Sequence, residues 1–237
     1  MMNDKSKRVL LIGHRGASKM APENTLKAFQ KAIDLKADYV EFDVHQSMDG
    51  ELIVIHDPNT FRSTGHRGSI KKMTLQEIKE LDAGEGEQIP TLEELITLAK
   101  GRIGLQLEIK ASGMAQKIVA ALQKADLIES TIVSSFIHNE LSKVQKMNPN
   151  IKLAPLLLGI RKNKTLQKAI DHKYGYLHPQ YKLITKAFLD AAHEKDIKVN
   201  AWTVDSRDDM EKLIAMGIDG IITNDVELAK EVLNRAK

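Results

Sequence analysis

Cysteine is absent from this chain of 237 residues. Its absence excludes disulfide bonds, thiolate nucleophiles and cysteine-ligated zinc sites. Aromatic residues are scarce, with one tryptophan, four tyrosines and five phenylalanines, and the net charge is only +3, from 35 basic and 32 acidic residues. Nucleic-acid binding usually needs a strongly basic surface and aromatic side chains for stacking, so we expect no nucleic-acid partner.

Long hydrophobic runs are also missing. No run approaches the roughly 18 residues that span a bilayer. The apolar run that follows the polar segment from Met1 to Arg8 is far too short for the core of a signal peptide. We therefore expect a cytoplasmic protein without stable membrane insertion. The composition, 42% hydrophobic and 28% charged, is that of an ordinary globular protein, and a homo-oligomer is compatible with it.

The sequence is rich in apolar runs that alternate with amphipathic segments. Continuous apolar runs such as Val9 to Ile12 are typical of strands covered on both faces in a parallel sheet. Eight such strands, each followed by a helix, predict a single α/β domain over 1–237, a closed (β/α)8 TIM barrel. An open doubly wound sheet is the second choice. The expected strands are 9–12, 39–44, 103–109, 131–135, 151–157, 174–177, 197–203 and 218–222.

Helix signals fill the segments between these strands. Asn24 is placed to cap the first helix, and Thr91 with Glu94 forms a capping box before another. The remaining expected helices are 114–124, 138–147, 163–171, 185–195, 207–215 and 225–235.

The stretch 57–89 interrupts the alternation. Several glycines and Pro58 break its pattern, and its one short helix follows Thr74, which forms a capping box with Glu77. Because it has few large apolar residues, we interpret it as a small insertion in the barrel rather than a second core. Before it, Asp49 and Gly50 predict a tight turn that leads into a strand over 52–55, antiparallel to its predecessor.

Three carboxylates are placed to meet at one end of the predicted barrel. Glu41 and Asp43 share one face of a strand, and Glu108 lies on another strand, opposite in face to its apolar neighbours. Residues near the carboxyl ends of barrel strands converge on one mouth. Clustered acids repel one another unless a cation lies between them, and an all-oxygen set favours Ca²⁺, Mg²⁺ or Mn²⁺ over zinc. Pairing of each acid with a basic residue at the rim is an equally good alternative.

His14 and His56 directly follow apolar runs, as residues at a barrel mouth should. Imidazole titrates near neutral pH, so such a pair can serve as general acid and general base. The alternative is that each merely bonds a backbone carbonyl. We favour the catalytic interpretation because the two histidines flank the strand of paired acids. The other histidines lack this company and are expected to be surface or packing residues.

Arg15 and Lys110 are candidates for binding an anionic group, Arg as a planar fork and Lys as a point charge. They could instead, or in addition, neutralise Glu23, Glu41 or Glu108. Trp202, the only tryptophan, lies near the end of a predicted strand, where it could form an apolar wall of the mouth. A lone tryptophan is more often simply part of a core.

Taken together, these segments resemble the glycerophosphodiester phosphodiesterase family over nearly the whole chain. Each fragment is weak by itself, but their order and spacing are highly specific. The matching segments are His14-Arg15-Gly16-Ala17, Pro22-Glu23-Asn24-Thr25, Glu41-Phe42-Asp43-Val44, Asp49-Gly50, His56-Asp57, Leu107-Glu108-Ile109-Lys110, Ser134-Ser135-Phe136, Ala201-Trp202-Thr203-Val204 and the run from Gly217 to Thr223.

The resemblance implies a TIM barrel with an insertion after the segment that ends at His56. It implies one divalent cation on the three acids, the two histidines as acid–base pair, Arg15 and Lys110 beside the phosphate, and Trp202 against the substrate. The implied reaction is hydrolysis of small glycerophosphodiesters, such as glycerophosphocholine or glycerophosphoethanolamine, to glycerol 3-phosphate and an alcohol. A phospholipase D-like action on lysophospholipids and a barrel that binds phosphodiesters without catalysis are the alternatives. The segment from Phe61 to Thr64 departs from the family, which has an acidic residue before the arginine.

Overall fold

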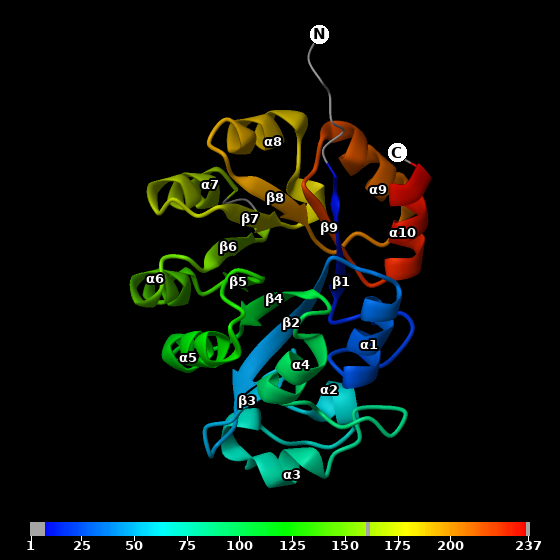
Figure 1. The fold of residues 1–237 in the computed structure, drawn as a ribbon, viewed down its shortest axis with the longest axis vertical. Coiled ribbons are helices and arrows are strands. Elements are labelled where there is room, and N and C mark those ends of the chain that lie inside the picture. Colours follow the sequence, from blue (N-terminus) through cyan, green and yellow to red (C-terminus); the bar gives the residue numbers. More distant parts are fainter. Residues whose placement is uncertain (1–7, 160–161, 236–237) are drawn as a thin grey trace.

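The protein is a closed parallel barrel surrounded by helices, as the alternation predicts (Figure 1). The computed structural model describes residues 8–159 and 162–235. Neighbouring strands follow the order β1-β9-β8-β7-β6-β5-β4-β2, and pairing of β1 with β2 closes the ring, so the open-sheet alternative is wrong. The barrel strands are β1 (Leu10–His14), β2 (Tyr39–Gln46), β4 (Gly104–Ile109), β5 (Thr131–Ser135), β6 (Lys152–Leu157), β7 (Tyr176–Pro179), β8 (Lys198–Ala201) and β9 (Gly220–Thr223).

Helices cover the outside of the barrel (Figure 1). The larger ones are α1 (Leu26–Asp34), α4 (Leu92–Ala99), α5 (Ala115–Ala125), α6 (His138–Met147), α7 (Lys162–Asp171), α8 (Lys186–His193), α9 (Arg207–Met216) and α10 (Val226–Arg235), with the 3-10 turn η3 (Tyr181–Leu183) before α8. Their buried faces pack on the outward side chains of the strands, such as Leu105 and Leu107, in one continuous apolar core. Within the described ranges, no helix is long and apolar enough to cross a membrane.

The period of two along each strand decides which side chains enter the barrel. On β2, Val40, Phe42 and Val44 pack outward into the core beneath the helices. Glu41 and Asp43 therefore project to the inside of the barrel. The polar face predicted for this strand is thus the face that lines the barrel interior, and this places charge at its centre.

After β2 the chain forms strand β3 (Leu52–Val54), which is antiparallel to β2 as expected. It continues through α2 (Phe61–Thr64), the 3-10 turn η1 (Ile70–Lys72) and α3 (Leu75–Lys79), at the bottom of Figure 1. We expected no second core in this segment. That expectation is wrong, because a small one is present. A separate apolar cluster forms because isoleucines spread along the chain converge on β3: Ile53, Ile55, Ile70, Ile78 and Ile89.

Two predicted helix caps are confirmed and one is corrected. Thr74 and Thr91 both form complete capping boxes with the glutamate three residues later. The first helix is capped by Thr25, whose side chain accepts a hydrogen bond from the Ala28 amide, and not by Asn24. The Asn24 backbone is left-handed, with φ 58°, and its side chain points to Asp43 instead.

Candidate functional site

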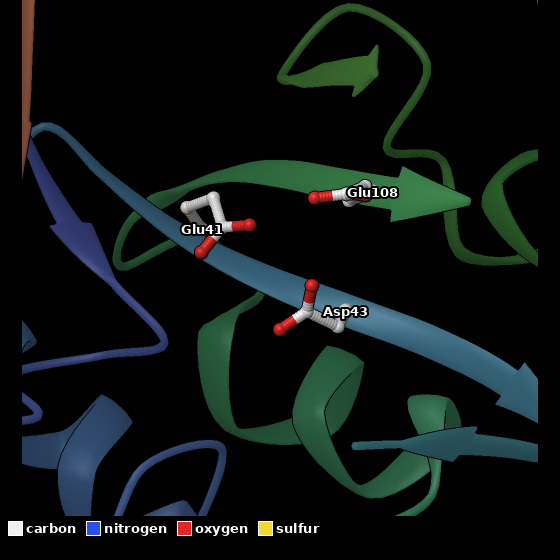
Figure 2. A group of neighbouring side chains, drawn as sticks. All are labelled: Glu41, Asp43 and Glu108. Atoms are coloured by element: carbon white, nitrogen blue, oxygen red, sulfur yellow. The ribbon is translucent and has the colours of Figure 1, made fainter. Parts of the chain in front are cut away.

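The three acids singled out in the sequence lie together inside the barrel (Figure 2). Glu41 and Asp43 come from β2, and Glu108 comes from the neighbouring β4, where it pairs in register with Asp43. All three are buried. One oxygen from each lies within 4.8 Å of the others. A single ion with oxygen ligands about 2.4 Å away can bridge such a span.

Two cations partly neutralise this cluster. Lys110 Nζ lies 2.9 Å from Glu108 and 3.3 Å from Asp43, and Arg15 Nε lies 3.3 Å from the other oxygen of Asp43. Burial by itself would raise the pKa of Asp43. The charges of Lys110 and Arg15 outweigh burial and hold that pKa below its usual range. The predicted pairing of these basic residues with the acids is therefore present.

Lys110 and Arg15 do not fully neutralise the three carboxylates, so the cluster suits a further cation. Burial and the nearby Asp43 raise the pKa of Glu41 well above its ordinary value. The same two causes raise the pKa of Glu108 to about 7. Three buried carboxylates thus face two cations, and a divalent ion would supply the missing positive charge. The oxygen-only donor set fits Ca²⁺, Mg²⁺ or Mn²⁺.

Arg15 is held in an unusual backbone conformation at the end of β1. Its φ is 55°, in the left-handed region, and its amide donates a 3.0 Å hydrogen bond to Glu41. Gly16, with φ 83°, follows it, and a Cβ there would meet the backbone of Ala28 at 2.6 Å. The turn therefore needs glycine at this position and aims the Arg15 amide at the acid cluster.

His14 is the last residue of β1, and a hydrogen bond to one nitrogen fixes the orientation of its ring. Nδ1 lies 2.7 Å from Asn224 Oδ1. The amide of Asn224 is itself fixed by Asp205, which accepts from its side-chain nitrogen at 2.6 Å. With Nδ1 donating to this oxygen, Nε2 is the atom available to a ligand. Burial, aided by the charge of Arg15, lowers the pKa of His14 and so favours the neutral imidazole.

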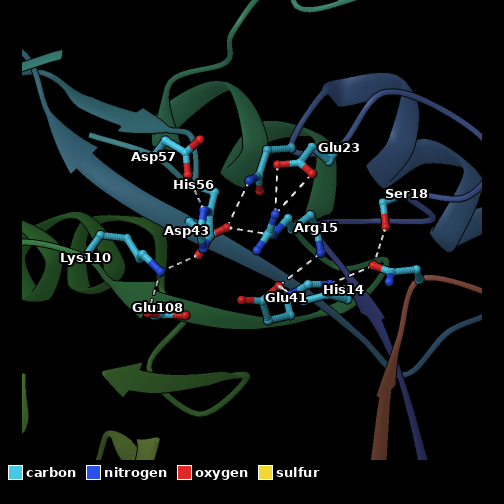
Figure 3. A network of polar contacts seen from close by, with 12 residues as sticks. His14, Arg15, Ser18, Glu23, Glu41, Asp43, His56, Asp57, Glu108 and Lys110 are labelled. Carbon is cyan, nitrogen blue, oxygen red and sulfur yellow. Dashed lines mark hydrogen bonds and ion pairs between the residues drawn. The ribbon is translucent and has the colours of Figure 1, made fainter. Parts of the chain in front are cut away.

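His56 is anchored in the same way from the other side (Figure 3). Its Nδ1 lies 2.6 Å from Asp57 Oδ1, and Asp57 also accepts a 2.7 Å hydrogen bond from Arg62 Nε. Arg62 Nη2 donates to Glu23 at 2.7 Å, and Glu23 binds Arg15 through two contacts at 2.9 and 3.1 Å. A continuous network thus links Arg62 and Arg15 to Asp57, the carboxylate that orients His56.

A cavity of about 100 Å³ opens beside these groups. Trp202 forms part of its apolar wall, just beyond the end of β8 rather than within the strand. Its indole donates to the His178 carbonyl at 2.7 Å and packs edge-to-face on Phe136, with ring centroids 5.7 Å apart. The lining residues are His14, Arg15, Glu41, His56, Gln106, Glu108, Lys110, Phe136, Leu156, Trp202, Thr203 and Ile222.

Every residue proposed from the sequence is therefore at this mouth, with seven lining the cavity and Asp43 bonded to two of them. A larger groove of about 500 Å³ lies on the outer surface between α4 and α5 and contains none of them. It lacks imidazoles, so the smaller cavity is the better candidate for chemistry.

Sequence reasoning missed the residues that support the site. Asn224 directly follows β9, so the rule that strand ends converge on the mouth could have found it. Glu23, named as a possible partner of Arg15, does bind it, but Arg62 carried no signal, because its contact with Glu23 joins segments 39 residues apart. His45, expected to be a packing residue, is indeed buried, and its Nε2 lies 3.1 Å from the carbonyl oxygen of His56.

A parallel barrel with a charged, partly buried cavity at the carboxyl ends of its strands has the architecture of TIM-barrel enzymes. Over residues 14–228 the sequence matches the Glycerophosphoryl diester phosphodiesterase family, and the chain belongs to this family. It is an enzyme of this class, which excludes the alternative of a non-catalytic binding barrel.

Individual relatives agree with this assignment. The chain is 40% identical over 233 residues to the glycerophosphodiester phosphodiesterase of Caldanaerobacter subterraneus subsp. tengcongensis, with 93% of this chain and 96% of the relative covered. The crystal structure of the Thermotoga maritima enzyme has a TM-score of 0.83 at 28% identity, covering 94% of this chain and 98% of that one. An Oleispira antarctica phosphodiesterase, solved with the product sn-glycerol-3-phosphate, has a TM-score of 0.87 at 27% identity, with 95% and 96% covered.

Proposed function

We propose that this enzyme hydrolyses small glycerophosphodiesters, such as glycerophosphocholine and glycerophosphoethanolamine, to glycerol 3-phosphate and an alcohol. Family membership and the product in the Oleispira antarctica structure support this substrate class. The observation that carries the proposal is the pair of histidines on one cavity, each with Nδ1 fixed by an oxygen acceptor. A pair of imidazoles held in this way suits proton transfer at two sides of one phosphorus atom.

We further propose that Glu41, Asp43 and Glu108 hold one divalent cation, with Ca²⁺, Mg²⁺ and Mn²⁺ as the candidates. Their incomplete neutralisation by Lys110 and Arg15 supports this proposal. The bound ion would supply positive charge to the phosphoryl oxygens, on which negative charge gathers in the transition state.

His14 acts as the base in the first step of this mechanism. It takes the proton from the 2-hydroxyl of the glycerol arm, whose oxygen then forms a bond to phosphorus. His56 donates its proton to the departing alkoxide, so the phosphorus–oxygen bond to the alcohol breaks and a cyclic phosphate remains. In the second step water attacks phosphorus while His56 takes its proton, the bond between phosphorus and the 2-oxygen breaks, and His14 returns a proton to that oxygen. The sum consumes one water and releases the alcohol and glycerol 3-phosphate.

Arg15 and Lys110 bind the phosphate in this scheme, and Trp202 contacts the substrate. Both cations line the cavity and lie beside the acids. Each lies 3.3 Å from Asp43, so both stay beside the acid cluster while they face the cavity that would hold the phosphate.

One observation favours a second candidate, action on lysophospholipids. Phe136, at the edge of the cavity, is 43% exposed, and Leu158 on the next strand–helix loop is 57% exposed. An acyl chain could cover such apolar side chains. Glycerophosphocholine remains the better candidate, because the product in the Oleispira antarctica structure is sn-glycerol-3-phosphate, whereas the same hydrolysis of a lysophospholipid would release an acylated glycerol phosphate.

A direct assay separates these candidates. Purified enzyme is given glycerophosphocholine or lysophosphatidylcholine, each with chelator and after addition of Ca²⁺, Mg²⁺ or Mn²⁺. We expect release of choline from glycerophosphocholine that stops with chelator and returns with at least one ion. Activity confined to lysophosphatidylcholine would favour the second candidate. Full activity in chelator would refute the metal assignment.

A further inference from the structure

Gln106 is a cavity residue to which the mechanism above assigns no task. It lies on β4, two residues before Glu108 and on the same face, and pairs in register with Glu41. Its side chain is therefore about 6.6 Å deeper in the barrel than that of Glu108, by the rise of a strand. Only 1% of the residue is exposed, yet it lines the cavity. Gln106 thus contributes to the floor of the site.

The amide oxygen of this residue is unsatisfied. Among the described residues, none provides a hydrogen-bond partner for the buried Oε1 atom of Gln106. Buried polar atoms nearly always have a partner, because leaving one without is costly. Because Gln106 lines the cavity, its incompletely satisfied amide is suited to a hydrogen bond with a bound ligand.

The substrate offers two arms on either side of its phosphate. The phosphate must lie near Arg15, Lys110 and the two imidazoles. The alcohol arm leaves and must reach solvent, so the glycerol arm extends inward to the floor. A cavity of about 100 Å³ admits only a short arm of this kind. A neutral amide suits a hydroxyl group, which can both donate and accept, better than it suits a charged group.

We propose that Gln106 hydrogen-bonds the terminal hydroxyl of the glycerol arm and makes the enzyme selective for glycerol. This inference rests on the proposed function and adds the residue that recognises the retained half of the substrate. A site built to bind a hydroxyl rejects an analogue without it, because the buried amide is then left unpaired. Gln106 itself takes no part in proton transfer.

The test compares two substrates. One is glycerophosphocholine, and the other is its analogue in which hydrogen replaces the terminal hydroxyl while the 2-hydroxyl remains. We expect the wild-type kcat/KM to favour glycerophosphocholine by about 100-fold or more. Gln106→Leu should reduce this preference at least about 10-fold, by slowing glycerophosphocholine and sparing the analogue. An equal loss on both substrates, or an unchanged preference, would overturn the inference.

Asn200 provides a matched control. It is also a buried amide inside the barrel with an unpartnered oxygen among the described residues, but it does not line the cavity. Asn200→Leu should change both substrates alike. If Gln106→Leu does not fold, Gln106→Asn shortens the side chain by one carbon and should also lower the preference. Loss of Ca²⁺ binding by Gln106→Asn, measured by calorimetry, would make Gln106 a metal ligand and overturn the proposal.

The proposed function and the role of Gln106 can be disproved separately. A wild-type enzyme that leaves glycerophosphocholine intact with every ion would disprove the proposed function. An active wild-type enzyme whose preference survives Gln106→Leu would disprove only the role of Gln106.

Discussion

Arg62 Nε lies 2.7 Å from Asp57 Oδ2, so a side chain of the insertion holds the carboxylate that orients His56. Arg62 also reaches Glu23, the partner of Arg15. The insertion therefore connects to both sides of the site. Thr60, the buried residue directly before α2, donates to the His66 carbonyl at 2.7 Å and fixes the start of this helix, from which one arginine spans the two acids.

Replacing Arg62 by alanine should lower kcat by about 10- to 100-fold, because Asp57 and Glu23 lose their shared partner and His56 and Arg15 lose orientation. The side chain is 46% exposed, so the thermal stability should change little. Steady-state kinetics and thermal unfolding measure the two effects. Guanidinium added to Arg62→Ala should restore part of kcat. Normal kcat with a much lower Tm would show that Arg62 serves only folding.

Replacing either His14 or His56 by alanine should reduce kcat by about 10²- to 10⁴-fold, since each loses one proton-transfer step. His66→Ala is the control, because His66 is exposed on the insertion. Choline release from glycerophosphocholine, with the ion at saturation, gives the rates. A histidine variant with wild-type kcat would remove that residue from the mechanism.

Neutralising the acids one at a time should affect the metal-free protein in opposite directions. Glu41→Gln should stabilise it at pH 8, because the burial of a charge and the repulsion from Asp43 that together raise the pKa of Glu41 are removed. Asp43→Asn should destabilise it, because Lys110 and Arg15 lose the partner whose pKa they lower. Urea unfolding in chelator measures both. The same sign for both variants would contradict this account.

Both variants should nevertheless lose activity and bind Ca²⁺ at least about 10-fold more weakly, as calorimetry would show. The metal-free wild-type protein is then less stable than Glu41→Gln. This is expected where the charges are required for function rather than for folding. Wild-type ion affinity in Glu41→Gln would exclude Glu41 as a ligand.

His178 should make the protein sensitive to acid. Burial lowers its pKa to about 3, whereas the unfolded chain takes up the proton near pH 6.5. Between these values the unfolded state binds more protons, so stability falls as the pH falls below 6.5. The loss reaches about 2 kcal/mol at pH 5. His178→Gln should show a shallower fall from pH 7 to 5 in urea unfolding, with chelator present. An identical slope would contradict the prediction.

How much the sequence could predict differs between the barrel and its site. The alternation of β2 and β4 was enough to place Glu41, Asp43 and Glu108 on the inner face, because a period of two leaves no other choice. The end of β1 was enough to place His14 at the mouth, whereas His56 follows β3, an antiparallel strand outside the barrel, so its position there needed the structure. The cap of α1 was wrong, because Asn24 and Thr25 are adjacent residues that can both cap a helix, and only the contact with Asp43 decides between them.

By itself, the sequence determined the order of the barrel strands and larger helices along the chain, the inward faces of β2 and β4, and the family. These follow from local periodicity and from segments whose residues are near in the chain. Only the tertiary structure decided that Asn224 supports His14, that Arg62 joins Glu23 to Asp57, and that Gln106 has a buried oxygen without a partner among the described residues. These relationships join segments distant in sequence, and they depend on how the barrel closes and how the insertion packs.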